Sequence, residues 1–155
     1  MKQRALQIFL SGVNNVLPDN IIRSKIELND RYLKISESEF DLSTIKNIYL
    51  FAFGKAAYLM AKEAEDILAD RIAGGLAVTK YGHGGKLNHL TIVEAGHPIP
   101  DNKGVEATKQ IQEIIEKAKE NDLVLCLISG GASALLADLP KDTSLNDLTR
   151  VNELL

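Results

Sequence analysis

The sequence has little of what would place it outside the cell, in a membrane or on nucleic acid. It contains a single cysteine, Cys126, which cannot form an internal disulfide, and no Cys/His spacing typical of structural zinc. No run approaches the ~20 apolar residues that a membrane-spanning helix needs. The net charge of -3 leaves no basic footprint for nucleic acid. We therefore expect a cytoplasmic protein without nucleic-acid or membrane partners.

What is present is an ordinary globular composition. Of the 155 residues, 45% are hydrophobic and 25% are charged, which suits one domain or part of a larger one. Apolar runs rich in β-forming residues predict four core strands, at 48–54, 73–80, 90–95 and 122–129. Apolar residues at three- and four-residue steps predict helices at 2–17, 18–26, 55–71, 102–120 and from Ser144 onward. Asn29-Asp30 predicts a hairpin turn between the second helix and the first core strand.

The alternation of strands and helices predicts an α/β fold, a Rossmann-like three-layer sandwich with a mostly parallel sheet. Right-handed crossovers would bring the loops that follow the core strands to one edge of the sheet. Ligands bind at that edge in such sheets, so the candidate site residues are sought in those loops.

The first loop, 52–57, joins a strand to a helix through Gly54 and Lys55. Gly54 allows a tight turn, free N–H groups at the helix start would face an anion, and Lys55 would add positive charge. The spacing is not that of a Walker A motif. A lysine at a helix start is disfavoured by the helix dipole, so both an anion-binding and a solvated lysine stay open.

The second loop, 94–104, carries His97 and Asp101. Pro98 holds His97 in an extended conformation. His97 could be a general base or could hydrogen-bond substrate, or it could serve only the turn. Asp101 is predicted to cap the following helix, with substrate contact as the alternative.

The third loop consists of Ser129, Gly130, Gly131, Ala132 and Ser133, between the last core strand and an Ala/Leu run. Two adjacent glycines allow backbone N–H groups to converge into a nest for an anion, and the serine hydroxyls add donors. A plain tight turn needs glycine but not flanking serines, so we favour ligand contact over a turn. Neither the dinucleotide fingerprint nor the nucleophile elbow is present.

A fourth loop, 80–86, is rich in glycine and contains His83. It could be a mobile flap over the same edge. The composition favours a flexible surface loop.

The chain resembles the type 2 glycerate kinases, often named hydroxypyruvate reductases, in four blocks that occur in the family's order. These blocks are FGKAAYLMA, GGLAVTKYGHGG, VEAGHPIPDNKG and DLVLCLISGGASALL. The resemblance runs from residue 2 to the end of the chain. It implies ATP-dependent phosphorylation of glycerate to 2-phosphoglycerate, with ATP and magnesium as cofactors. It also implies that Lys55 is the active-site lysine and that the Ser-Gly-Gly-x-Ser turn faces phosphate or substrate.

Members of this family look like two-domain α/β proteins more than twice this length, with the site between the domains. The resemblance therefore implies that residues 1–155 are the N-terminal portion of the large α/β domain, inactive alone, with a C-terminal remainder missing. The chain also stops inside an amphipathic pattern at Leu154-Leu155, which leads us to expect a longer natural protein. An apolar stripe on this last helix could instead be covered in a homodimer.

The magnesium ligands are expected elsewhere, because no carboxylate pair in this sequence forms an obvious metal site. Two alternatives to the kinase stay open. One is a hydroxypyruvate reductase, against which the missing nicotinamide fingerprint argues. The other is a non-catalytic α/β module that binds a small anion or a partner chain.

Overall fold

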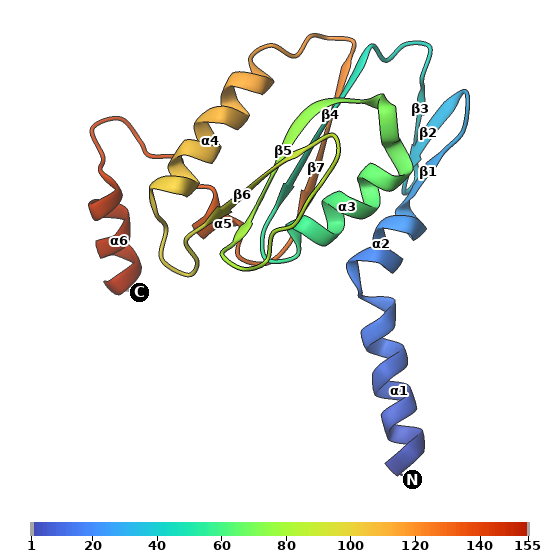
Figure 1. Ribbon diagram of the computed structural model, residues 1–155, viewed down its shortest axis with the longest axis horizontal. Helices are drawn as coiled ribbons and strands as arrows, with labels where there is room; N and C mark the ends of the chain where they lie inside the picture. The colour runs from blue at the N-terminus through green and yellow to red at the C-terminus, as the bar shows by residue number, and fades with distance from the viewer. Residues whose placement is uncertain (1, 155) are drawn as a thin grey trace.

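The computed structural model describes residues 2–154, and its elements follow the predicted order (Figure 1). In chain order they are α1 (Lys2–Asn15), α2 (Pro18–Lys25), β1 (Ile26–Leu28), β2 (Tyr32–Ile35), β3 (Ser38–Asp41), β4 (Asn47–Phe53), α3 (Ala57–Leu68), η1 (Ala69–Arg71), β5 (Ile72–Lys80), β6 (Thr91–Ala95), α4 (Asn102–Ile115), β7 (Asp122–Ile128), α5 (Ala132–Leu135) and α6 (Leu145–Leu154). Within residues 2–154 no helix has both the length and the apolar character needed to cross a membrane.

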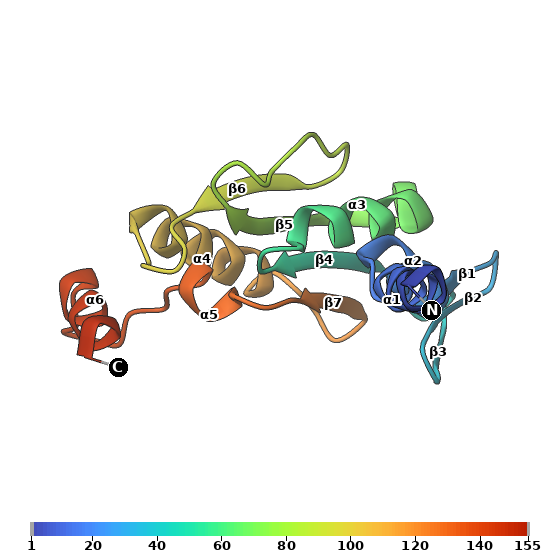
Figure 2. The ribbon, with the colours of Figure 1, turned by 90° about the horizontal axis from the view of Figure 1, so that it is seen from below.

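Four strands form one parallel sheet in the order β6-β5-β4-β7, which Figure 2 shows side by side. Side chains along the central strand β4 alternate between the two faces of the sheet. Leu50 and Ala52 belong to the core that includes α3, whereas Phe51 and Phe53 belong to the core that includes α4 and α5. Helices therefore cover both faces (Figure 1), and the predicted three-layer α/β sandwich is confirmed.

The strand β7 departs from its prediction as a core strand. It lies at the edge of the sheet and pairs with β4 alone among the described residues. Val124, Cys126 and Ile128 are exposed. A continuous apolar run is typical of a strand covered on both faces, so the run alone gave no sign that half of its side chains are exposed here.

A small antiparallel sheet, β1-β2-β3, precedes the main one. The predicted hairpin turn is present, because Oδ1 of Asn29 accepts hydrogen bonds from the N–H groups of Arg31 (2.9 Å) and Tyr32 (2.7 Å). The strand β3 was not predicted, since its sequence Ser-Glu-Phe-Asp has no apolar run. The helix α4 ends at Ile115, five residues before the predicted end.

The helix α1 projects away from the α/β body on the side where the strands of the main sheet end (Figures 1 and 2). None of its residues is buried. The next helix, α2, is anchored to the body because Ile22 is buried in the core.

Candidate functional site

The order of the parallel strands reverses at β4, because β5 and β6 lie on one side of it and β7 on the other. Such a reversal separates the loops that leave two neighbouring strands and opens a crevice in which ligands bind. The loops after β4 and β7 meet at this point. The N–H of Lys55 donates to the carbonyl of Gly130 at 3.0 Å, and the N–H of Ser129 donates to the carbonyl of Phe53 at 2.8 Å. The first and third predicted loops are thus brought together.

Three N–H groups in or just before the first turn of α3 are already occupied. The N–H of Gly54 donates to Val78 O at 3.1 Å, and that of Ala57 donates to Gly54 O at 3.1 Å. The N–H of Ala56 donates to Oγ of Ser129 at 3.1 Å. These three N–H groups therefore do not face an anion, because the protein supplies their acceptors. The N–H groups of Tyr58 and Leu59, on the first turn of α3, have no acceptor among residues 2–154, so free donors at this helix start remain a prediction.

The hydroxyl of Ser129 joins the two loops. It accepts from Ala56 and donates to Phe53 O at 3.2 Å, so it is engaged within the protein. The N–H groups of Gly130 and Gly131, in contrast, have no acceptor among residues 2–154. They are among the donors that this edge leaves free.

The remaining residues of the third loop enter the short helix α5. Gly131 has a φ of +93°, a conformation that favours glycine, and it turns the chain into the helix. Ala132 packs against the core that includes α4, while Ser133 is exposed on the first turn. The backbone turn at Gly131 and the hydrogen bonds of the Ser129 hydroxyl, but not Ser133, explain the shape of this loop.

Lys55 and His97 lie beside the two glycines. A Cβ added to Gly131 would lie 2.7 Å from Nε2 of His97 and 3.4 Å from Cγ of Lys55. A Cβ added to Gly130 would lie 3.9 Å from Cε of Lys55. The aliphatic stem of Lys55 therefore crosses the glycine pair, and the imidazole rests on Gly131. None of the ion pairs found in residues 2–154 involves Lys55.

Asp101 is engaged in structural hydrogen bonds. Its Oδ1 accepts from the N–H of Gly104 at 3.1 Å, which confirms the predicted cap of α4, and its Oδ2 accepts from the hydroxyl of Tyr81 at 2.7 Å. Burial acts to raise the pKa of Asp101, but the hydrogen bonds from Tyr81 and from the N–H groups of Gly96 and Gly104 lower it overall. These bonds fix the loop that carries His97, so Asp101 positions that loop.

The fourth loop, 80–86, lies at the surface, where residues 81–83, 85 and 86 are exposed, and two contacts tie it to the body. The N–H of Gly84 donates to Oε1 of Glu94 at 2.7 Å, and this hydrogen bond is the main cause that lowers the pKa of Glu94. The backbone of Gly85 lies against the ring of Tyr58, because a Cβ there would lie 2.7 Å from Cε2. Tyr58 follows Lys55 by three residues, so the loop reaches the neighbourhood of the site.

Glu65 secures residues 88–90, just after that loop, and its role was missed in the sequence. Its side chain is only 4% exposed. Its carboxylate accepts from the N–H groups of Asn88 (2.9 Å), His89 (2.6 Å) and Leu90 (3.2 Å). Its spacing of four residues from the buried Ala61 was the available signal.

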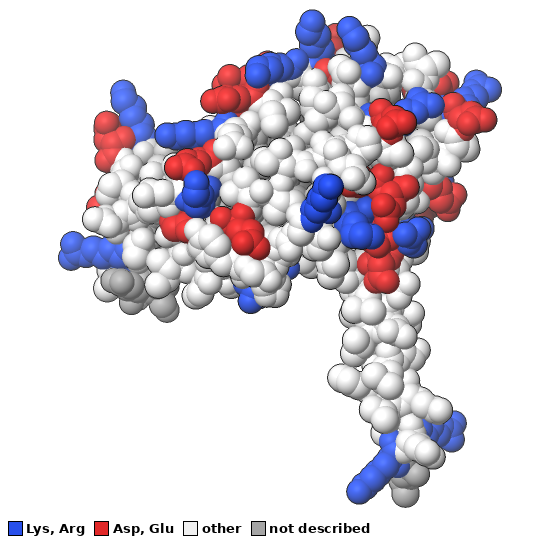
Figure 3. All heavy atoms as spheres, viewed as in Figure 1, with Lys and Arg blue, Asp and Glu red and all other residues white. Residues whose placement is uncertain are grey.

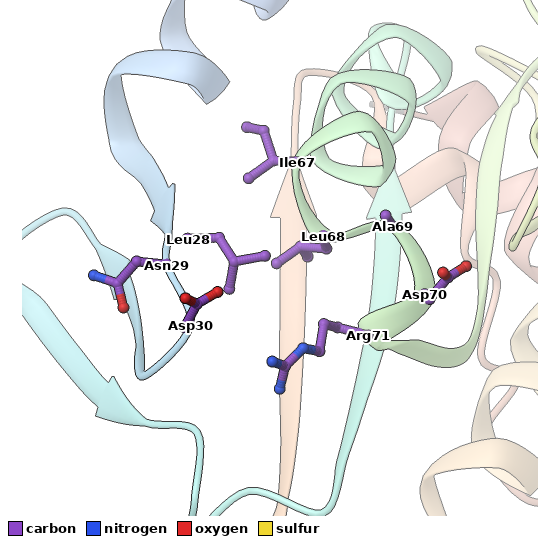
Figure 4. Close-up of a pocket in the computed structure, with 8 residues that line it drawn as sticks. All are labelled: Leu28, Asn29, Asp30, Ile67, Leu68, Ala69, Asp70 and Arg71. Atoms are coloured by element: carbon purple, nitrogen blue, oxygen red, sulfur yellow. The ribbon is translucent and has the colours of Figure 1, made fainter.

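A hollow of about 470 Å³ lies at the other end of the sheet, between the β1–β2 turn and the η1 segment that leads into β5 (Figure 4). Figure 4 shows Asn29 and Asp30 on one wall and Arg71 on the other. The hollow is separate from the loops described above. No group of three His, Cys, Asp or Glu side chains within residues 2–154 is placed to hold a metal ion, there or elsewhere.

Comparisons with known proteins agree with one another. The family model described as a domain of unknown function, DUF4147, matches residues 4–155. The chain is 37% identical over 156 residues to the glycerate 2-kinase of Pyrococcus horikoshii, covering 100% of this chain and 34% of that protein. The crystal structure of the PH0495 protein from the same organism matches with a TM-score of 0.90 and 36% identity, over 99% of this chain and 34% of that one.

The crystal structure of a glycerate kinase from Thermotoga maritima matches with a TM-score of 0.82 and 32% identity. That match covers 98% of this chain and 34% of the T. maritima chain. The chain thus spans about a third of the length of the relatives that it matches.

Proposed function

The chain belongs to the DUF4147 family, and its relatives include proteins named glycerate kinase; from that premise we propose that it carries part of a site where ATP phosphorylates glycerate to 2-phosphoglycerate. The observation that supports this proposal is the meeting of Lys55, His97 and the N–H groups of Gly130 and Gly131 at the reversal of the strand order. Phosphoryl transfer depends on positive charge and aligned donors around the moving group. These residues supply both.

Each group has a role that follows from its place. The ammonium group of Lys55 stabilises the negative charge of an anion held at the loop, because its stem lies across Gly130 and Gly131. The two N–H groups donate to the oxygens of the same anion. The imidazole of His97, resting on Gly131, exchanges a hydrogen bond with the hydroxyl of glycerate, while Asp101 keeps its loop in place.

ATP fits these residues as an anion and supplies the phosphoryl group when bound. Gly131 leaves the space beside His97 open, because a Cβ there would lie 2.7 Å from Nε2 of His97. Magnesium does not fit the described residues, since residues 2–154 contain no suitable ligand cluster and Asp101 is already hydrogen-bonded. We therefore assign no metal ligand here and derive no step through the metal. The other groups of the site would come from polypeptide that the relatives have beyond the match.

Calorimetric titration of the chain with D-glycerate and, separately, with Mg-ATP tests the proposal. We expect at least one of the two to bind and Lys55→Ala to weaken that binding by about tenfold, or about 1.4 kcal/mol. Lys34→Ala is the matched control, because Lys34 is an exposed lysine on β2, outside these loops. It should leave the affinity unchanged.

Other outcomes discriminate between the candidate functions. Equal affinity in Lys55→Ala and in the control would remove the proposed role of this lysine. Binding of NADH with turnover of hydroxypyruvate would favour a reductase over a kinase. Heat from inorganic phosphate alone, with none from glycerate or Mg-ATP, would favour a non-catalytic anion-binding module.

A further inference from the structure

The helix α1 carries an apolar stripe that the described chain does not cover. Leu6, Phe9 and Val13 follow one another at steps of three and four residues, which places them on one face of the helix, and Val16 comes just after its end. Phe9 is 65% exposed and Val16 is 66% exposed. A helix of 14 residues is marginal in water when nothing packs against it. The helix is therefore built for a contact that residues 2–154 do not provide.

Charge is nearly absent from this helix. Its only charged residues are Lys2 and Arg4, and Figure 3 shows an uncharged surface along α1 with basic side chains at its far end. The α/β body in the same view is covered by side chains of both signs. Exposed faces of stable helices are usually polar, so the surface of α1 resembles a buried interface rather than a solvated one.

The apolar surface continues from α1 to the candidate site. A groove of about 240 Å³ is lined by Val16, Ile21, Met60 and Ile128, and it also touches Ala56 and Ser129. Those last two residues form the hydrogen bond that joins the site loops. Ile128 is 67% exposed at the end of the edge strand β7. One surface thus extends from the projecting helix to the loop that carries Gly130 and Gly131.

We propose that α1 and this groove form a docking surface. Its occupant is the polypeptide equivalent to the part of the relatives that lies outside the match. About two thirds of the P. horikoshii protein lies outside the match, enough to form a folded unit with an apolar face. Seated against Val16 and Ile128, this unit lies directly beside Ser129 and closes the site on that side. A second copy paired through α1 alone would leave Ile128 and the edge of β7 exposed. The inference rests on this surface and on the family, not on the phosphoryl chemistry.

Hydrogen exchange in this chain and in the intact P. horikoshii glycerate 2-kinase tests the proposal. We expect the backbone amides of residues 5–15 to exchange at nearly unprotected rates in this chain. The aligned amides of the longer relative should be protected about a hundredfold more strongly. The amides of β4 serve as the internal control and should be protected in both proteins. Equally unprotected helices in both proteins would overturn the proposal.

A double variant separates docking from packing within the chain. Phe9→Ser with Val13→Ser should leave the melting temperature unchanged, because neither side chain is buried. Ile22→Ser, at a position only 5% exposed on the neighbouring helix, should lower it. An equal fall in the double variant would overturn the proposal, since α1 would then pack on its own body. Sedimentation that shows a dimer of the chain, lost in the double variant, would overturn it in favour of a second copy.

Discussion

Replacing Gly54 with alanine should separate the two loops that form the site. Gly54 has a φ of +114°, and a Cβ there would lie 2.5 Å from the carbonyl oxygen of Ser129. That oxygen belongs to the backbone and cannot rotate aside. The end of β7 must therefore move, and the hydrogen bonds from Lys55 to Gly130 and from Ala56 to Ser129 are lost with it.

The size of the effect follows from these losses. A residue other than glycine with a left-handed backbone costs about 1–2 kcal/mol. Four hydrogen bonds cross between the loops, including two from Ser129 to the carbonyl of Phe53, and each contributes about 0.5–1.5 kcal/mol. The expected loss is about 3–8 kcal/mol, compared with a total stability of about 5–15 kcal/mol for a typical domain. The variant should be near the limit of folding.

Urea unfolding followed by circular dichroism measures this loss, and Gly82→Ala is the matched control. Gly82 has a φ of +74° but nothing within 4 Å of an added Cβ. It should therefore lose only the backbone cost of about 1–2 kcal/mol. If Gly54→Ala is no less stable than Gly82→Ala, the close approach of Gly54 to Ser129 does not hold the loops together.

Three further perturbations test other parts of the structure. Asp101→Ala removes the cap and the bond from Tyr81, costing about 1–2 kcal/mol at neutral pH. The folded-state pKa of Asp101 is lowered, so the stability that its carboxylate contributes is lost as pH falls through that pKa. The free energies of unfolding of Asp101→Ala and wild type, measured in urea, should therefore differ less near pH 3 than at neutral pH. An equal difference at both pH values would contradict the structural role of the ionised carboxylate. Glu65→Gln replaces one acceptor oxygen with an NH2 group, so at least one N–H group of residues 88–90 loses its acceptor. This loss should cost about 1–3 kcal/mol and speed hydrogen exchange there; unchanged exchange would argue against this role of Glu65. Cys126 is exposed at the edge strand, yet partial desolvation by its neighbours raises its pKa, so iodoacetamide should label it more slowly at neutral pH than free cysteine, as measured by mass spectrometry; equal rates would contradict this desolvation.

Local patterns in the sequence were sufficient for the central layers of the fold. The apolar run of β4 and the Ala-rich stripe of α3 each match one regular structure, so their type and order could be predicted. Gly54 and Gly131 were predicted to form tight turns, and both have the positive φ that favours glycine.

The sequence did not reveal which hydrogen bonds would be made across the loops. Whether the N–H of Lys55 is free or occupied depends on the carbonyl of Gly130, which lies 75 residues away in sequence and reaches it only through the strand order. The role of Glu65 was missed for the same reason, since its hydrogen-bond partners at 88–90 come from another segment. The apolar pattern of α1 predicted a helix but held no information on what covers it.

The hydrogen bonds between the loops after β4 and β7 also bear on how an anion would be captured. Ser129, Lys55 and Ala56 are fixed to one another before any ligand arrives, so the conformational entropy of the loops is lost during folding rather than during association. An incoming anion would then find the Gly130 and Gly131 donors preorganised, and this wall would need little motion.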